Sequence, residues 1–183
     1  MARKKQKKQK SGIWYVLGIT LLTFILAVTM QFLCDVVLDK LYIVYGFFIL
    51  LAVILIGIIF DILGVATTSV SEISFHAMAS DKVKGAKESI VLIKNAEKVS
   101  NICNDVVGDV CGIISGSIST FLVASLNLEN FGSQSIIVSL CIMGSVSALT
   151  VGGKAFGKFI AIANNRKIVF FAGKLISIFK FRR

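Results

Sequence analysis

Four long runs of apolar residues limit what this chain can fold into. The runs cover 13–33, 41–60, 110–128 and 131–151, and each has about 20 residues, the length that an α-helix needs to cross a bilayer. Barrel strands would alternate polar and apolar side chains, whereas residues 49–56 are apolar throughout. With 56% hydrophobic residues, the chain is also too apolar for an ordinary soluble domain. We therefore predict an all-α integral membrane protein with four transmembrane helices.

Basic residues are distributed unevenly around these runs. Of 20 Lys and Arg, six lie in residues 1–12, five in 65–109 and eight in 152–183, which leaves only Lys40 for the two short loops. Basic residues collect on the cytoplasmic side of membrane proteins. We therefore expect a multi-pass protein of the cell membrane with both termini and the middle segment in the cytoplasm. The turns at 34–40 and 129–130 are expected outside.

The same pattern divides the chain into parts. We predict a basic cytoplasmic arm (1–12) and an additional N-terminal transmembrane helix (13–33). A transmembrane domain (41–160), which contains a cytoplasmic juxtamembrane segment (65–100), and a basic amphipathic C-terminal helix (161–183) follow. A signal peptide also begins with basic residues, but the first run is longer than a signal needs and no cleavage site follows it. We therefore expect the first helix to stay uncleaved.

The juxtamembrane segment and the tail have the pattern of amphipathic helices. In the segment, Ser80 or Asp81 is expected to cap a helix whose apolar stripe runs beside several lysines. The tail repeats this combination of apolar and basic residues. We expect both helices to lie on the anionic inner leaflet, with a soluble partner helix as the alternative. Nucleic acid is not an expected partner.

The third run carries polar residues at a depth where membranes rarely hold them. Asp105 and Asp109 stand one turn apart, Asn101 or Asn104 adds an amide oxygen, and Ser115 adds a hydroxyl. Oxygen atoms of these kinds are the ligands that Mg²⁺ prefers. A structural explanation stays open, because Asn and Asp favour helix N-termini and nearby lysines can pair with either aspartate. Helical spacing predicts one shared polar face, made of Asn101, Asp105, Gly108, Gly112, Ser115 and Ser119.

Two further acidic residues lie near the end of the second run. Asp61 and Glu72 are eleven residues apart, so both are expected to face one groove if the helix continues between them. His76 is the only histidine, and the four cysteines contain no Cys-x-x-Cys pair. We therefore expect no zinc site, no disulfide framework and no bound cofactor. No nucleophile has an identifiable base, so an enzyme is not expected.

The order of these segments resembles the transmembrane domain of the cyclin M / CorB family, which is implicated in magnesium efflux. The resemblance covers about residues 45–179. Its most specific part is Ser69-Val-Ser-Glu-Ile-Ser-Phe75, which looks like the family's serine-and-glutamate exit from its first span and carries the glutamate over to Glu72. Residues 101–116 resemble the family's asparagine-containing polar span, with that asparagine at Asn101 or Asn104. The resemblance implies a homodimer and Mg²⁺ as the transported ion.

The chain departs from this family at two points. The family's Gly-Glu-x-x-Pro-Lys stretch reads Gly153-Lys-Ala-Phe-Gly-Lys158 here, so Lys154 replaces an acid and Gly157 a proline. A lysine opposes a bound cation, and we expect the helix to loosen at these glycines. The nucleotide-binding CBS pair and terminal soluble domain that family members often carry are not expected in this chain.

Two functions follow from these patterns. The first is transport or homeostasis of a divalent cation, with Mg²⁺ as the ion that the resemblance implies. It would use a cytoplasm-facing cavity lined by acidic and polar residues of the second and third spans. Its candidate cation path consists of Asp61, Glu72, Asn104, Asp105, Asp109 and Ser115. The alternative is a non-transporting membrane adaptor that binds anionic lipid or a partner protein, and Lys154 favours it.

Overall fold

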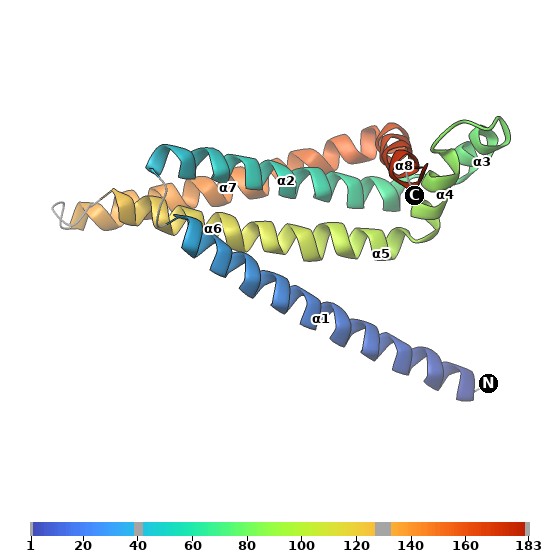
Figure 1. Cartoon of the computed structure of the whole chain (residues 1–183), viewed down its shortest axis with the longest axis horizontal. Coiled ribbons are helices and arrows are strands. Elements are labelled where there is room, and N and C mark those ends of the chain that lie inside the picture. Colours follow the sequence, from blue (N-terminus) through green and yellow to red (C-terminus); the bar gives the residue numbers. More distant parts are fainter. Residues whose placement is uncertain (1, 39–41, 127–132, 182–183) are drawn as a thin grey trace.

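The computed structural model describes residues 2–38, 42–126 and 133–181 of the chain (Figure 1). Within these residues every regular element is a helix, and four helices are long and apolar enough to cross a membrane. Their membrane-length stretches are Leu17–Cys34, Ile43–Ser69, Ala96–Ser125 and Ile136–Ala163. The predicted all-α protein with four membrane-length helices is therefore confirmed at this level. The predicted turn at 129–130 and part of the turn at 34–40 lie outside the described residues.

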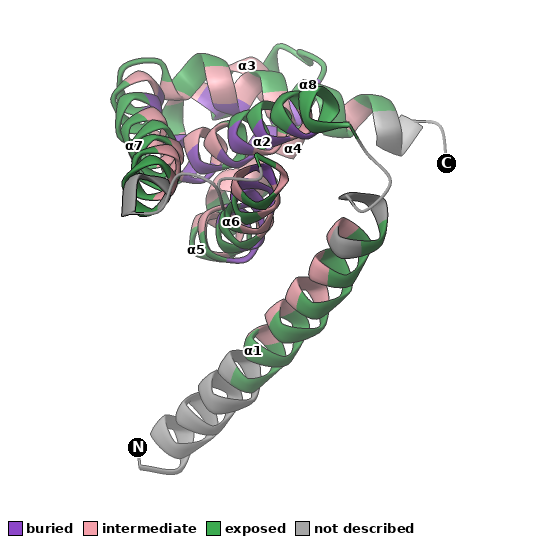
Figure 2. Cartoon of the chain, turned by 90° about the vertical axis from the view of Figure 1, so that its left-hand side faces the viewer, coloured by how far each residue is buried: buried purple, intermediate pink, exposed green. Residues whose placement is uncertain are grey.

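Three of the four long helices form a bundle, and α2 (Ile43–Ser69) is its central member. On one side α2 packs on the third span, which consists of α5 (Ala96–Ser100), the π-helix η1 (Asn101–Val107) and α6 (Gly108–Ser125). On another side it packs on α7 (Ser133–Ala163), as the end view in Figure 2 shows. An apolar cluster lies between α2 and α6 and consists of Leu50, Ile54, Ile118 and Leu122.

Helix α1 (Ala2–Leu38) stands apart from this bundle. It leans on α6 at one end and then diverges from the other helices (Figures 1 and 2). Across the contact, the Ser117 hydroxyl of α6 donates a hydrogen bond to Gln31 Oε1. The backbone is helical from Ala2 onward, so the described part of the predicted arm continues α1 without a break.

The second span is longer than predicted. Polar residues after Phe60 suggested an exit, but α2 continues to Ser69. The Thr67 and Ser69 hydroxyls donate to the carbonyl oxygens of Leu63 and Val65, at 2.7 and 2.8 Å, so these polar side chains are satisfied within the helix itself. Asp61 consequently lies inside the helix. Because α2 ends at Ser69, the helix does not continue from Asp61 to Glu72, and the condition for a shared groove is not met.

The fourth span also continues past its predicted end at 151, since α7 is helical to Ala163. The glycines at which we expected loosening serve instead as a close helix contact. A Cβ atom at Gly157 would lie 2.9 Å from Ile62 Cγ1, and one at Gly153 would lie 3.3 Å from Ile58 Cγ1. Small residues at these two positions therefore allow α7 to approach α2.

Three short helices cover the end of the bundle: α3 (Ile73–Ser80), α4 (Ala86–Lys94) and α8 (Asn165–Phe181). The predicted helix start at Ser80 or Asp81 is wrong, because Ser80 ends α3 and Asp81 is its C-cap. The chain reverses through Gly85, whose φ of 93° favours glycine, and only then begins α4. Gly173 of α8 packs directly on this turn, where a Cβ would lie 2.6 Å from Gly85 O.

Candidate functional site

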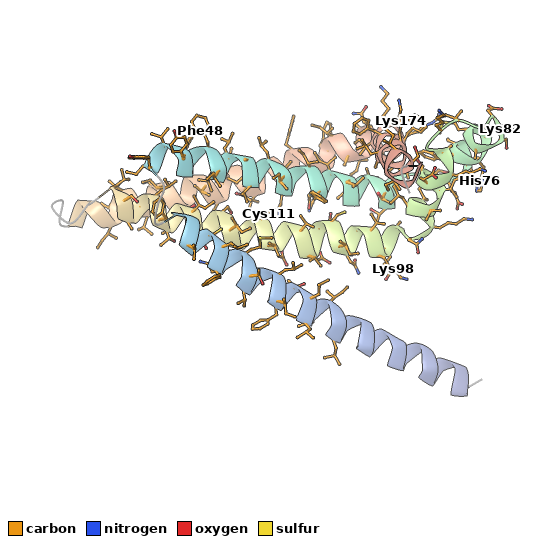
Figure 3. The ribbon with its side chains drawn as sticks, in the orientation of Figure 1. Phe48, His76, Lys82, Lys98, Cys111 and Lys174 are labelled. Carbon is orange, nitrogen blue, oxygen red and sulfur yellow. The ribbon has the colours of Figure 1, made fainter. Side chains whose placement is uncertain are left out.

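One face of α2 turns towards the third span and carries Gly57, Asp61 and Gly64, at spacings of four and three residues. Gly57 lies against Cys111 of α6, since a Cβ there would be 3.1 Å from Cys111 Cβ (Cys111 is labelled in Figure 3). Gly64 lies against Asn104 of η1. Asp61 stands between these two contacts and is only 4% exposed, so its carboxyl group is buried at the helix interface.

Asn104 is oriented by its own helix and by α2. Its Nδ2 donates to Ser100 Oγ at 3.2 Å, one turn earlier. Its side chain presses on Gly64, where a Cβ would overlap Oδ1 and lie 2.8 Å from Cγ. The absence of a side chain at Gly64 is therefore what gives the Asn104 amide its place. We call Asp61, Gly64 and Asn104 the α2–η1 polar contact.

Two oxygen atoms of this contact are buried without a hydrogen-bond partner among the described residues: Asp61 Oδ2 and Asn104 Oδ1. No ion pair to Asp61 is present in that part of the chain either. Buried polar atoms in native proteins are nearly always partnered, and one left unsatisfied costs about 1–3 kcal/mol, more when charged. Each of these two oxygens therefore lacks a partner that a hydrogen-bond donor or a cation could supply.

All parts of the contact lie at a similar distance from the end of the bundle. Asp61 comes eight residues before the end of α2, and Asn104 comes eight residues after the start of α5. At a rise of about 1.5 Å per residue, both are about 12 Å inside the spans. A carboxylate at this depth almost always faces a bundle interior or a water-filled path.

The π-helix changes which residues of the third span share a face. A π-turn closes hydrogen bonds to the fifth residue and so rotates the side chains that precede it relative to an α-helix. Gly108, Ser115 and Ser119 are buried, whereas Asp105 and Gly112 are exposed. Within α6, Gly112, Ser115 and Ser119 keep the predicted common face and line one groove, whereas Asn101 and Asp105 belong to the π-helix that precedes it. π-turns occur frequently at functional sites, which draws attention to 101–107.

A positive charge lies next to the contact. Lys154 of α7 reaches towards Gly108, one turn after Asn104, where a Cβ would be 3.3 Å from Lys154 Nζ. The lysine comes nine residues before the end of α7, which is again the depth of Asp61 and Asn104. It makes no ion pair with Asp61 within 4.0 Å among the described residues. An ammonium group at this place opposes the entry of a second cation.

The other predicted site residues lie elsewhere. Asp105 and Asp109 are exposed, and neither forms an ion pair in the described part of the chain. Ser115 is buried two turns beyond Gly108 and donates to Gly112 O at 2.9 Å. Glu72 lies outside the spans at the start of α3. Within 2–38, 42–126 and 133–181, no three His, Cys, Asp or Glu side chains converge on a possible metal site.

Glu72 has two partners, one of which the sequence did not reveal. Its Oε1 lies 2.9 Å from His76 Nε2 and 3.6 Å from Lys94 Nζ. The Glu72–His76 pair follows from a four-residue spacing, but the bond to Lys94 depends on how α3 and α4 pack. Gly64 was missed as well, although its three-residue spacing from Asp61 marks a common face.

A groove of about 450 Å³ lies between α6 and α7. Small and polar residues line much of it, among them Gly112, Gly116 and Thr120 of α6 and Ser147 and Thr150 of α7. Ser115 lines this groove, but Asp61, Glu72, Asn104, Asp105 and Asp109 do not. Asp109 precedes Gly112 and Gly116 at helical spacing, so an acid continues this side of α6 towards the basic end of the bundle.

Comparison of the chain with known protein families, with curated proteins and with solved structures finds no match in any of the three. The resemblance to the cyclin M / CorB family therefore stays a prediction that is based on the sequence motifs.

Proposed function

We propose that this chain is a divalent cation transport or homeostasis protein of the cell membrane, with Mg²⁺ as its cargo and Asp61 and Asn104 as ligands in the cation path. The observation that carries this proposal is the pair of buried, unpartnered oxygens in the α2–η1 polar contact. A carboxylate and an amide oxygen are hard ligands, and Mg²⁺ keeps several of its waters, so two protein oxygens are enough to begin a site. The proposed membership of the cyclin M / CorB family agrees with this cargo.

The proposed orientation has both termini in the cytoplasm. It is supported by 19 of the 20 basic residues, which the sequence places in the arm, the juxtamembrane segment and the fourth span with its tail. In this orientation the α2–η1 polar contact lies nearer the cytoplasmic side. A cation from the cytoplasm then passes the field of Glu72, Asp105 and Asp109, exchanges waters for Asp61 and Asn104, and meets Ser115 deeper in the span.

We further propose that two copies of the chain associate through the exposed side of α6. Asp105 and Asp109 are exposed at membrane depth, and contact of their carboxylates with lipid would be unfavourable. Beside them, a Cβ at Gly112 or Gly116 would meet no atom within 4 Å. Small residues with open space above them are the kind of surface on which transmembrane helices pair. A partner copy would cover this surface, and the homodimer implied by the family resemblance supports the same arrangement.

The function is tested by Mg²⁺ flux into proteoliposomes that contain the purified protein, with Ca²⁺ and Co²⁺ as competitors. We expect Mg²⁺-selective flux for the wild type and its loss in Asp61→Asn, which keeps the shape of the side chain and removes its charge. Asp81→Asn is the matched control, because Asp81 is an exposed acid at the end of α3. Folded wild-type protein that carries no Mg²⁺ flux would contradict the proposal.

The second candidate function is the membrane adaptor, and the place of Lys154 favours it. Its ammonium group already lies beside Gly108, close to where a cation would bind. For an adaptor, Asp61→Asn would leave cellular Mg²⁺ content unchanged. Neutralising the basic residues of α8 would instead release the partner protein or move it away from the membrane.

A further inference from the structure

A second cavity, of about 650 Å³, lies at the end of the bundle and away from the α2–η1 polar contact. One wall is the turn between α3 and α4, and the other is the last part of α8, at Ser177 and Ile178. The two walls are far apart in sequence, so the cavity exists only because α8 folds back on α4. Its volume is in the range of small-molecule sites.

The turn side of the cavity is basic. Lys82, Lys84 and Lys87 line it, and Glu88 is the only acid among the described residues of its lining. None of the three lysines takes part in an ion pair within the described residues, in contrast to Lys94, which binds Glu72. Three uncompensated ammonium groups and one carboxylate leave an excess of positive charge, which favours an anion with more than one negative charge.

The other side of the cavity is apolar. Val83 and Ile178 line it and are 38% and 58% exposed. Ile178 continues a stripe of α8 with Phe171 and Leu175, which are also exposed, at spacings of four and three residues. This stripe lies on the side of α8 away from Val169 and Gly173, which are buried. The cavity therefore joins a cationic wall to an apolar surface that protein does not cover.

The place of the cavity matches a membrane surface. Helix α8 begins directly after α7 ends at Ala163 and runs across the end of the bundle (Figures 1 and 2). In Figure 3, Lys82 lies at this same end, beyond the spans, and Lys174 lies on α8, level with the last turns of α2. The α4–α8 packing also holds the cavity in shape, because the Ser89 hydroxyl donates to Val169 O at 3.2 Å.

We propose that this cavity binds an anionic phospholipid whose headgroup ends in a phosphomonoester. The phosphate lies among Lys82, Lys84 and Lys87, and an acyl chain follows Ile178 along the stripe of α8. A phosphomonoester carries about −1.5 to −2 charge at neutral pH, which matches the basic wall better than a singly charged phosphodiester. A free phosphate would use only the lysines and would leave the apolar wall without a partner.

This inference rests on the expected contact of α4 and α8 with the anionic inner leaflet, but it is independent of cation transport. It is tested by binding of phosphatidic acid to the full-length protein in nanodiscs of otherwise zwitterionic lipid, with phosphatidylglycerol as the singly charged comparison. We expect the triple variant Lys82→Gln, Lys84→Gln, Lys87→Gln to bind phosphatidic acid about tenfold or more weakly than the wild type. The matched control removes three exposed lysines outside the cavity, at Lys98, Lys158 and Lys167, and is expected to bind normally.

Two further measurements separate specific lipid binding from loss of folding and from binding of free phosphate. Glu88→Gln should tighten binding, and an unfolded variant would not produce that result. Millimolar inorganic phosphate should leave phosphatidic acid bound. Equal weakening in both triple variants would overturn the proposal in favour of general surface charge, and displacement by inorganic phosphate would overturn it in favour of a free phosphate site. Because no flux is measured, these results do not depend on whether the protein moves Mg²⁺.

Discussion

The two sides of the third span differ in a way that the residue types alone do not reveal. The side against α2 carries Asn104 and Cys111, which pack on glycines of α2; it has no acidic residue of its own, yet it meets a buried carboxylate from α2. The other side carries Asp105 and Asp109, and both are exposed. The helix therefore shows its charges on one side and its unsatisfied buried oxygen on the other.

This difference indicates at which oxygen atoms a bound cation would gain the most free energy. The carboxylates of Asp105 and Asp109 lie on the surface that we propose a partner copy to cover, away from the two buried oxygens. A buried oxygen without a hydrogen bond gains the full value of any ligand that reaches it. We therefore place the centre of the cation path at Asp61 and Asn104 and assign Asp105 and Asp109 to its surroundings and to the dimer contact.

The largest difference between the two sides is expected when neighbouring residues of η1 are changed. We expect Asn104→Leu to lower Mg²⁺ flux about 30-fold or more, because a buried ligand is replaced by a side chain without oxygen. Asp105→Asn should lower flux by less than about threefold, since that carboxylate is exposed and is not part of the α2–η1 polar contact, so it acts on the cation only through its field. Initial rates in proteoliposomes measure both. A larger loss from Asp105→Asn would reverse the assignment of the two sides.

A smaller effect is expected from the steric support of the contact. Gly64→Ala places a Cβ where the Asn104 amide now lies. We expect a destabilisation of about 1–3 kcal/mol in detergent and a flux loss of about tenfold. Gly18→Ala is the control, because a Cβ at Gly18 would meet nothing within 4 Å. Unchanged thermal unfolding and flux in Gly64→Ala would show that the Asn104 position does not matter.

The exposed side is tested by its effect on association. We expect Gly112→Leu and Gly116→Leu to weaken the dimer about tenfold, because the new side chains occupy open space that a partner helix would fill. Gly144→Leu of α7 also has open space around it and should leave the dimer intact. The mass of the protein in detergent, measured over a range of concentrations, follows the equilibrium. Equal behaviour of all three variants would place the contact elsewhere.

The smallest expected change comes from the charge beside the contact. Lys154→Gln should tighten Mg²⁺ binding by about two- to fivefold, because it removes a like charge near Asn104. Lys158→Gln, on the exposed side of the same helix, should have no comparable effect. Concentration dependence of flux measures the difference. Weaker Mg²⁺ binding in Lys154→Gln would mean that the lysine supports the site instead of opposing it.

Much of the fold was predictable from the sequence, because the length of an apolar run directly sets whether a helix can cross a membrane. The boundaries were less so. Thr67 and Ser69 satisfy their hydroxyls within α2, so polar residues that suggested an exit extend the helix. Ser80 has the chemistry of an N-cap, but the turn at Gly85, packed under Gly173, decides where α4 begins.

The residues of the candidate site could be predicted from the sequence, but their arrangement in space could not. Asp61 and Asn104 both belonged to that set, together with acids that the structure places elsewhere. The π-helix shifts the register of the third span, and no sequence pattern in 101–107 predicts it. The fit of Asn104 against Gly64 depends on packing between α2 and η1, which are far apart in sequence, so periodicity within either helix does not encode it.

The most direct test of the α2–η1 polar contact is equilibrium binding of Mn²⁺, followed by electron paramagnetic resonance and competed by Mg²⁺, in the purified full-length protein. Asp61→Asn is compared with the double variant Asp105→Asn, Asp109→Asn, which removes more charge. We expect a Mg²⁺-displaceable site that is lost in Asp61→Asn and retained in the double variant. A site that survives in Asp61→Asn and disappears in the double variant would contradict the central claim.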